Sequence, residues 1–99
     1  MNTENLIPVL TICSTHKIEP EFFKSLSESG LIQLITHEEI IYIPEEKLAE
    51  TESMIRLYSE LGINVEGIEA ILHLVQRVKD LQDELTRVKN RLSFYENIY

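Results

Sequence analysis

The C-terminal third of the chain, residues 64–99, is the feature that most constrains the fold. It holds no proline and a single glycine, Gly67, which falls in its first turn. Its apolar residues recur at steps of three and four, as at the a and d positions of a heptad repeat. The spacing predicts one helix, roughly 50 Å long at about 1.5 Å per residue. The apolar positions that define it are Ile68, Ile71, Val75, Val78, Leu81, Leu85, Val88, Leu92, Tyr95 and Tyr99.

A helix of this length cannot bury its whole apolar seam against the 63 residues that precede it. The step from Val78 to Leu81 is three residues where this pattern calls for four, a stammer in coiled-coil terms. We therefore expect residues 68–78 to close the core of a head formed by residues 1–63, and the distal part of residues 64–99 to pair with a second copy of the chain. Parallel and antiparallel pairing both remain open. The expected dimer contacts are Leu81, Leu85, Val88, Leu92 and Tyr95.

Two short helices are predicted at the start of the head. The first begins at about Pro8, because proline suits the first turn of a helix. The second has Glu19 at its N-cap and Gly30 just past its end, where a left-handed glycine is common. The connection at residues 15–17 has the length of a helix-turn-helix turn. The apolar side chains expected to face inward are Leu6, Val9, Leu10, Ile12, Cys13, Phe22, Phe23 and Leu26.

A β-hairpin is predicted next, from residues 31–36 and 40–43. β-Branched residues dominate both runs, as they do in strands. No Asn-Gly or Asp-Gly pair occupies the tip, so the turn type is open. A hairpin directly after a helix-turn-helix forms a small wing.

A third helix should open at Pro44, with acidic residues in the first turn where the helix dipole favours them. Gly62 ends it, and Asn64 can cap the long helix that follows, with Ile63 stapled against Ile68. The apolar face of the third helix is expected to comprise Leu48, Met54, Ile55, Tyr58 and Leu61.

The net charge of −8 lies almost entirely in the head. Residues 1–63 carry eleven acidic and four basic residues, a net charge of −7. DNA binding draws most of its affinity from Lys and Arg that neutralise phosphates. The expected recognition helix offers only Lys24, so we expect no nucleic-acid binding.

No constellation of residues predicts catalysis. His16, His37 and His73 are scattered along the chain. The chain has only three glycines, too few for most phosphate-binding loops. Cys13 and His16 have the spacing of half a metal site, but structural zinc normally needs four ligands. We therefore expect a protein that is not an enzyme and uses no cofactor or metal.

The compartment is also predicted from composition. The longest apolar run falls short of the 18 or so residues of a membrane span, and the first residues do not resemble a signal peptide. A single cysteine excludes an internal disulfide. We expect a cytoplasmic protein without membrane contact.

The order of these elements resembles MerR-type regulators, and the resemblance implies a mainly α fold: a winged helix-turn-helix head with a small hairpin wing, followed by a long coiled-coil helix. Residues 58–72 look like the junction before that family's dimerisation helix, and residues 29–32 look like the start of its wing. The Arg-Tyr-Tyr of that family's recognition helix is replaced here by Phe22, Phe23 and Lys24, and the basic wing residues are missing.

A closer resemblance is to the chaperone-modulator (CbpM) family, small MerR-like bacterial proteins without DNA-binding character. At Lys17 that family usually has glycine, so this lysine must adopt a left-handed conformation or the turn must differ. The positions that carry the resemblance are Ile12, Cys13, Ile18, Phe22, residues 30–32, residues 55–57, residues 63–72 and residues 81–92.

The resemblance implies a partner: the J-domain of a DnaJ-like co-chaperone of the curved-DNA-binding kind. Such modulators inhibit the co-chaperone's stimulation of Hsp70 and its binding to DNA. J-domains engage Hsp70 through a basic helix face, which an acidic head complements. A MerR-like DNA-binding transcription regulator and a structural coiled-coil adaptor with another basic partner are the alternatives. The acidic residues expected to contact the partner are Glu19, Glu21, Glu28, Glu38, Glu39, Glu45, Glu46, Glu50 and Glu52.

Overall fold

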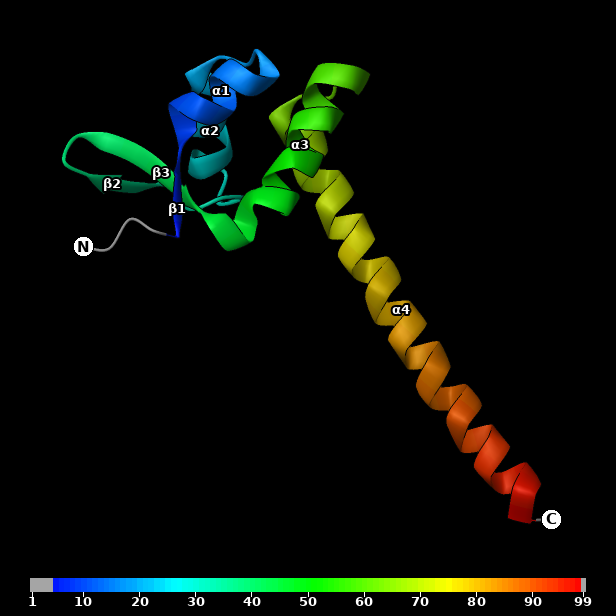
Figure 1. The fold of residues 1–99 in the computed structure, drawn as a ribbon. Helices are drawn as coiled ribbons and strands as arrows, with labels where there is room; N and C mark the ends of the chain where they lie inside the picture. Colours follow the sequence, from blue (N-terminus) through cyan, green and yellow to red (C-terminus); the bar gives the residue numbers. More distant parts are fainter. Residues whose placement is uncertain (1–4, 99) are drawn as a thin grey trace. The chain divides into compact units, whose positions relative to one another are not determined.

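The computed structural model describes residues 5–98 and is mainly helical, as the sequence predicts (Figure 1). The chain divides into two compact units, the first ending at Glu69 and the second beginning at Ala70. A single 3₁₀ turn, Glu45–Lys47, leads into α3. The elements in chain order are β1 (Leu6–Pro8), α1 (Val9–His16), α2 (Pro20–Glu28), β2 (Ile35–His37), β3 (Ile40–Pro44), α3 (Leu48–Leu61) and α4 (Val65–Ile98).

The start of the head differs from the prediction. Leu6 does not face inward from a helix but lies in β1, which pairs antiparallel with β3 and places Leu6 opposite Pro44. Pro8 has an extended backbone, with φ −62° and ψ 132°, so it ends the strand and is the N-cap of α1. Strand β1 depends on a partner more than thirty residues away in sequence, which no local pattern announces.

Leu10 is the second correction in α1. Its side chain is 69% exposed, although we expected it in the core. The buried residues of α1 are Val9, Ile12 and Cys13. These stand at i, i+3 and i+4 on one side of the helix, and Leu10 lies outside that stripe.

The sheet is smaller than predicted on the side of β2. The predicted strand over residues 31–36 is wrong at residues 31–34, because β2 begins only at Ile35, opposite Tyr42. Extending this register would place residue 33 opposite Pro44, where β3 ends and the 3₁₀ turn begins. Residues 31–33 therefore have no strand to pair with beyond that point. The sheet order is β1-β3-β2.

The hairpin turn consists of Glu38 and Glu39 alone. Both have positive φ, 51° and 66°. Two-residue hairpin loops of type I′ require this at both positions, a conformation that Asn-Gly adopts at less cost than a pair of glutamates.

The core of the head lies between α1, α2, α3 and the sheet. Phe22, Phe23 and Leu26 of α2 are buried as predicted, and Ile43 from β3 is fully buried with them. The Phe22 ring stacks on that of Tyr58 in α3, with centroids 4.3 Å apart. Two helical phenylalanines and a strand isoleucine thus form the centre of a core that α3 closes.

Helix α3 buries a face that differs from the expected one at both ends. Thr51 is fully buried, and its hydroxyl donates a hydrogen bond to the Lys47 carbonyl at 2.8 Å, which satisfies its polar atom. Met54 and Ile55 are buried as expected. Leu61, expected in the core, is 68% exposed: it lies two turns after Met54 on nearly the same face, but it is the last residue of α3.

The helix ends follow the local signals closely. Gly30 and Gly62 have φ of 77° and 66°, as residues at or just past the C-cap of α2 and α3. Lys17 takes the left-handed conformation at the end of α1, with φ 56° and ψ 51°. Of the two alternatives for this position, a left-handed lysine or a different turn, the first is therefore observed. Asn64 caps α4, its side-chain oxygen accepting a hydrogen bond from the Gly67 amide at 2.8 Å.

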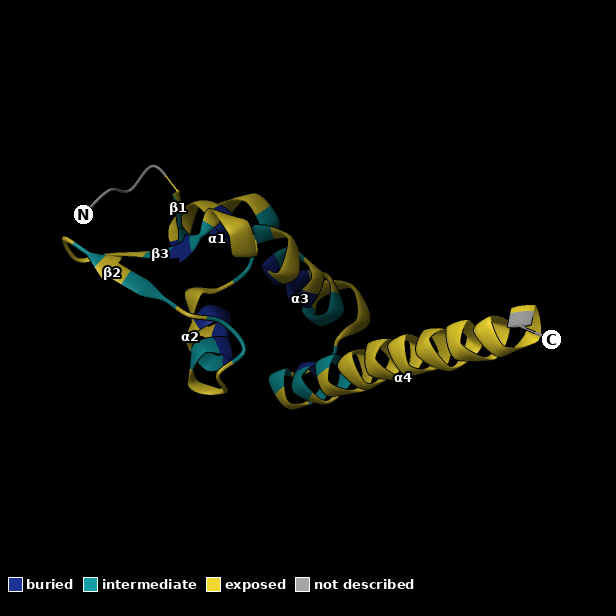
Figure 2. Cartoon of the chain, turned by 90° about the horizontal axis from the view of Figure 1, so that it is seen from below, coloured by how far each residue is buried: buried dark blue, intermediate teal, exposed yellow. Residues whose placement is uncertain are grey.

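The long helix is confirmed as one uninterrupted element, α4. Its first turn belongs to the first unit and contributes Ile68, which is fully buried. Every side chain from His73 to Asn97 is exposed (Figure 2). Of the residues expected to close the core, Ile68 is buried, whereas Val75 and Val78 are exposed.

The predicted stammer depends on which residue continues the seam before Val78. Leu74 and Val75 are both exposed, and they stand four and three residues before Val78. With Leu74 in the seam, the steps alternate four and three from Leu74 to Tyr95, and the short step of the stammer falls between Ile71 and Leu74 instead. The stammer at Val78 stays a prediction. The exposed residues that form the seam of α4 with this spacing are Leu74, Val78, Leu81, Leu85, Val88, Leu92 and Tyr95.

Candidate partner-binding surface

The nine glutamates predicted to meet a partner do not form one face. Glu45 and Glu46 lie beside the start of β1, around a shallow hollow lined also by Asn5, Leu6 and Pro44. Glu28 lies at the other end of α2, near Tyr58. Glu19 is the N-cap of α2, and Glu38 lies in the hairpin turn. The structure brings only Glu21 and Glu39 to the same apolar groove.

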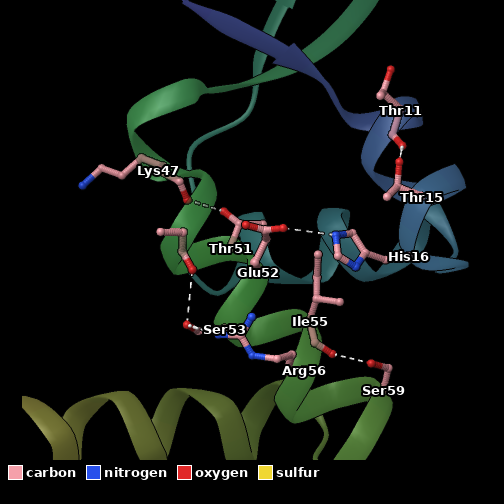
Figure 3. A network of polar contacts seen from close by, with 11 residues as sticks. Thr11, Thr15, His16, Lys47, Thr51, Glu52, Ser53, Ile55, Arg56 and Ser59 are labelled. Atoms are coloured by element: carbon pink, nitrogen blue, oxygen red, sulfur yellow. Dashed lines mark hydrogen bonds and ion pairs between the residues drawn. The ribbon is translucent and has the colours of Figure 1, made fainter.

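Two of the nine have partners within the head. Glu52 Oε2 lies 3.4 Å from His16 Nε2, which joins α3 to the last turn of α1 (Figure 3). Glu50 Oε1 lies 3.8 Å from Lys47 Nζ on the same stretch of chain. Pairs this exposed contribute little to stability. The geometry nonetheless gives Glu52 a contact inside the head that the sequence did not indicate.

The groove lies between α1, the first turns of α2 and the hairpin. Its volume is about 550 Å³, and most of its lining is apolar. The two acidic residues of the lining come from different elements, Glu21 from the first turn of α2 and Glu39 from the hairpin turn. Its lining residues are Val9 and Leu10, Pro20, Glu21, Phe23 and Lys24, and Leu34, Glu39, Ile40 and Ile41.

The apolar side chains of the groove are exposed because the hairpin is longer than the core it covers. Ile41 shares a face of β3 with the fully buried Ile43, two residues away. The hairpin extends beyond the helices toward its tip, so Ile41 and its neighbour Ile40 remain exposed (Figure 1). Leu10, which lines the same groove, is exposed as well. The sequence signal was available: two adjacent isoleucines point to opposite faces of a strand, and one sheet face alone can be buried.

The pKa of the Cys13 thiol differs from its ordinary value. Burial raises the pKa of this thiol, a hydrogen bond from the backbone lowers it, and the negative charge of Glu21 raises it further. The thiol is therefore held in its protonated form, which is neither nucleophilic nor metal-binding. Within residues 5–98 no group of three His, Cys, Asp or Glu side chains is placed to hold a metal ion.

The predicted dimer contacts all lie on the exposed seam of α4. The side chains of Leu81, Leu85, Val88, Leu92 and Tyr95 are each about half exposed. An apolar stripe of this length is the kind of surface that a second helix covers.

Among the described residues, no helix has the length and the apolar character needed to span a membrane.

A model of the MerR helix-turn-helix family of regulatory proteins matches residues 7–90. The chain belongs to this family. No curated protein and no solved structure matches it. Membership confirms the MerR-like part of the resemblance, while the narrower likeness to chaperone modulators stays a hypothesis.

Family membership gives the groove a position in a known architecture. In helix-turn-helix proteins the second helix presents its N-terminal residues to the bases of DNA. In this MerR-family chain the second helix is α2, and its first turns supply Pro20, Glu21, Phe23 and Lys24 to the groove. The surface that a DNA-binding relative would direct at phosphates and bases is here mostly apolar and carries two carboxylates against one ammonium.

Proposed function

We propose that this MerR-family protein is a non-enzymatic modulator that binds the J-domain of a DnaJ-like co-chaperone and inhibits it. The observation that carries the proposal is the character of the α2 and hairpin surface. Glu21 and Glu39 stand where a DNA-binding member needs positive charge, and Leu10, Ile40 and Ile41 are exposed beside them. Such a surface fits a basic protein with apolar side chains better than a phosphate backbone.

The charge of the head supports the same partner. Residues 1–63 carry a net charge of −7. Complementary charge accelerates the encounter of two proteins and suppresses wrong partners. A J-domain that uses a basic helix face to engage Hsp70 would be occupied by such a head and kept from Hsp70.

We further propose that the protein acts as a homodimer joined by α4. The seam from Leu74 to Tyr95 is apolar, exposed and unbroken. Acidic and basic residues alternate along its flanks: Asp83 and Glu84 stand within one turn of Arg87, and Arg91 follows Lys89. This is the flank of a solvated coiled coil rather than a track for phosphates.

A DNA-binding transcription regulator is the second candidate, because the family match is to regulatory proteins of the helix-turn-helix class. The two candidates differ in the sign of charge they require. A DNA-binding head loses affinity steeply with salt through counterion release from DNA, and it needs several Lys or Arg contacts to bind at all.

The test is a pair of titrations with the full chain. One uses the isolated J-domain of a DnaJ-like co-chaperone at about 50 mM and at about 300 mM salt, and the other uses duplex DNA under the same conditions. We expect J-domain binding that weakens at high salt, and no DNA binding. Tight DNA binding with no J-domain binding at low salt would reject the modulator in favour of the regulator.

A further inference from the structure

We propose that the groove between α1, α2 and the hairpin is the docking site for a basic amphipathic helix of a protein partner. The apolar face of that helix would enter the groove, and its basic flanks would meet Glu21 and Glu39. This inference rests on the proposed function in one respect, since a J-domain is the basic partner used to test it.

The first argument is the exposure of large apolar side chains in one place. Leu10 is 69% exposed, and the exposed residues Ile40 and Ile41 line the same groove. Single exposed apolar residues need no explanation, but several around one concave surface indicate a site that another molecule covers. The groove that they line has a volume of about 550 Å³.

The second argument is the arrangement of charge. Glu21 and Glu39 line the groove from different elements, and neither forms an ion pair with another described residue. Lys24 is the only basic residue of the lining. An occupant with an apolar stripe between basic flanks would bury the stripe and place its charges against two unpaired carboxylates.

The third argument concerns the form of the occupant. An extended peptide could instead add to the edge strand β2, but this strand has only three residues, Ile35–His37, and offers few hydrogen bonds. The groove is bounded by two helices and a projecting hairpin and presents side chains rather than a free strand edge. Insertion of a helix by its apolar face is the mode of peptide recognition that uses such a surface.

The chain offers a matched control for the apolar contact. Leu10 and Leu61 are both leucines near helix ends, 69% and 68% exposed, and only Leu10 lines the groove. We expect Leu10→Ser to weaken binding of the J-domain to the full-length protein at least tenfold, and Leu61→Ser to leave it within twofold. Both variants should retain the helical circular dichroism spectrum of the parent protein, because both positions are exposed. If the two variants bind the J-domain with equal affinity, the groove is not the docking site, although the proposed function is unaffected.

A second matched pair of variants tests the charge of the groove. Glu39→Lys reverses a carboxylate of the groove, whereas Glu60→Lys reverses an exposed carboxylate of α3 outside it. We expect the first variant to slow association with the J-domain at low salt by at least tenfold, and the second to change it by less than threefold. Equal effects would show that only the overall charge of the head matters, and would overturn the role of the groove.

A second probe separates failure of the groove from failure of the proposed function. Two synthetic helical peptides share one leucine face and carry either lysines or glutamates on their flanks. We expect the leucine–lysine peptide to bind the full-length protein, Leu10→Ser to abolish that binding, and the leucine–glutamate peptide not to bind. If the J-domain fails to bind but the peptides bind as expected, the J-domain is not the partner, and the groove remains the docking site for a basic helix. If both peptides bind alike, or Leu10→Ser binds the basic peptide as the parent does, the groove proposal is wrong.

Discussion

The rings of Phe22 and Tyr58 lie stacked between α2 and α3, with centroids 4.3 Å apart and planes inclined by 24°. Phe22 also meets the edge of Phe23 at 5.8 Å. The helix that a DNA-binding relative would use for recognition is thus held against α3 by aromatic packing. Its two phenylalanines face the core, and its charged residues remain outside.

This stack should be measurable as a coupling energy. We expect Phe22→Ala to lower the free energy of unfolding by about 3–5 kcal/mol, because a buried aromatic ring is removed. In a double-mutant cycle of Phe22→Leu and Tyr58→Leu, we expect a coupling of about 0.5–1.5 kcal/mol beyond the sum of single effects. Urea unfolding at one fixed protein concentration measures both, since a dimer's apparent stability depends on concentration. A coupling indistinguishable from zero would show that the two rings contribute independently.

Lys17 should be a site where glycine stabilises the protein. The left-handed conformation, φ 56°, costs a residue with a Cβ about 1–2 kcal/mol, part of which the greater chain entropy of unfolded glycine offsets. We expect Lys17→Gly to raise the free energy of unfolding by about 0.5–1 kcal/mol. The matched control is Lys24→Gly in α2, which should lower it by about 1 kcal/mol. A destabilised Lys17→Gly variant would mean that the lysine side chain stabilises the turn.

Stability should fall at alkaline pH through Cys13. Burial raises the pKa of this thiol above its ordinary value of 9.0, so the folded protein keeps a proton that the unfolded chain releases. The contribution is complete below the ordinary pKa and is lost as pH rises toward the folded value. We expect Cys13→Ala to show a shallower decline than the parent between about pH 8.5 and 10.5. Parallel stability curves for the two proteins over this range would contradict the assignment.

The seam of α4 should hold the dimer together. Leu85→Asp combined with Leu92→Asp places two charges in the apolar stripe, where burial of an unpaired carboxylate is costly. We expect the variant to sediment as a monomer and to keep a folded head. The control is Asp83→Asn, an exposed change off the seam, which should leave the sedimentation mass unchanged. A dimer that survives the double substitution would place the contact elsewhere.

Leu74 and Val75 distinguish the unbroken heptad from the stammer. Both are exposed, and they stand four and three residues before Val78, respectively. We expect Leu74→Ala to weaken dimerisation at least tenfold, and Val75→Ala to change it by less than threefold. Dilution series by analytical ultracentrifugation compare the two. The reverse order would favour the stammer and would place Val75 rather than Leu74 in the dimer contact.

Local signals explain which elements were predictable. Pro20 at the start of α2, Gly62 at the end of α3 and Asn64 at the start of α4 act through backbone groups within a few residues. The long helix was predictable for the same reason, because an apolar repeat without proline leaves few alternatives. The groove was harder to foresee. Its residues come from three elements that sequence spacing does not relate, so the sequence could not show which of the nine acidic candidates line it.

By itself the sequence determined the helices, their caps, the acidic head and the apolar repeat of α4, because each depends on neighbours along the chain. Tertiary structure alone decided that Leu6 pairs in a strand opposite Pro44 and that Leu10 and Leu61 face outward while Thr51 is buried. Burial depends on which distant element packs against a side chain. An apolar residue at the margin of a helical stripe can therefore become part of the core or part of a surface that another protein covers.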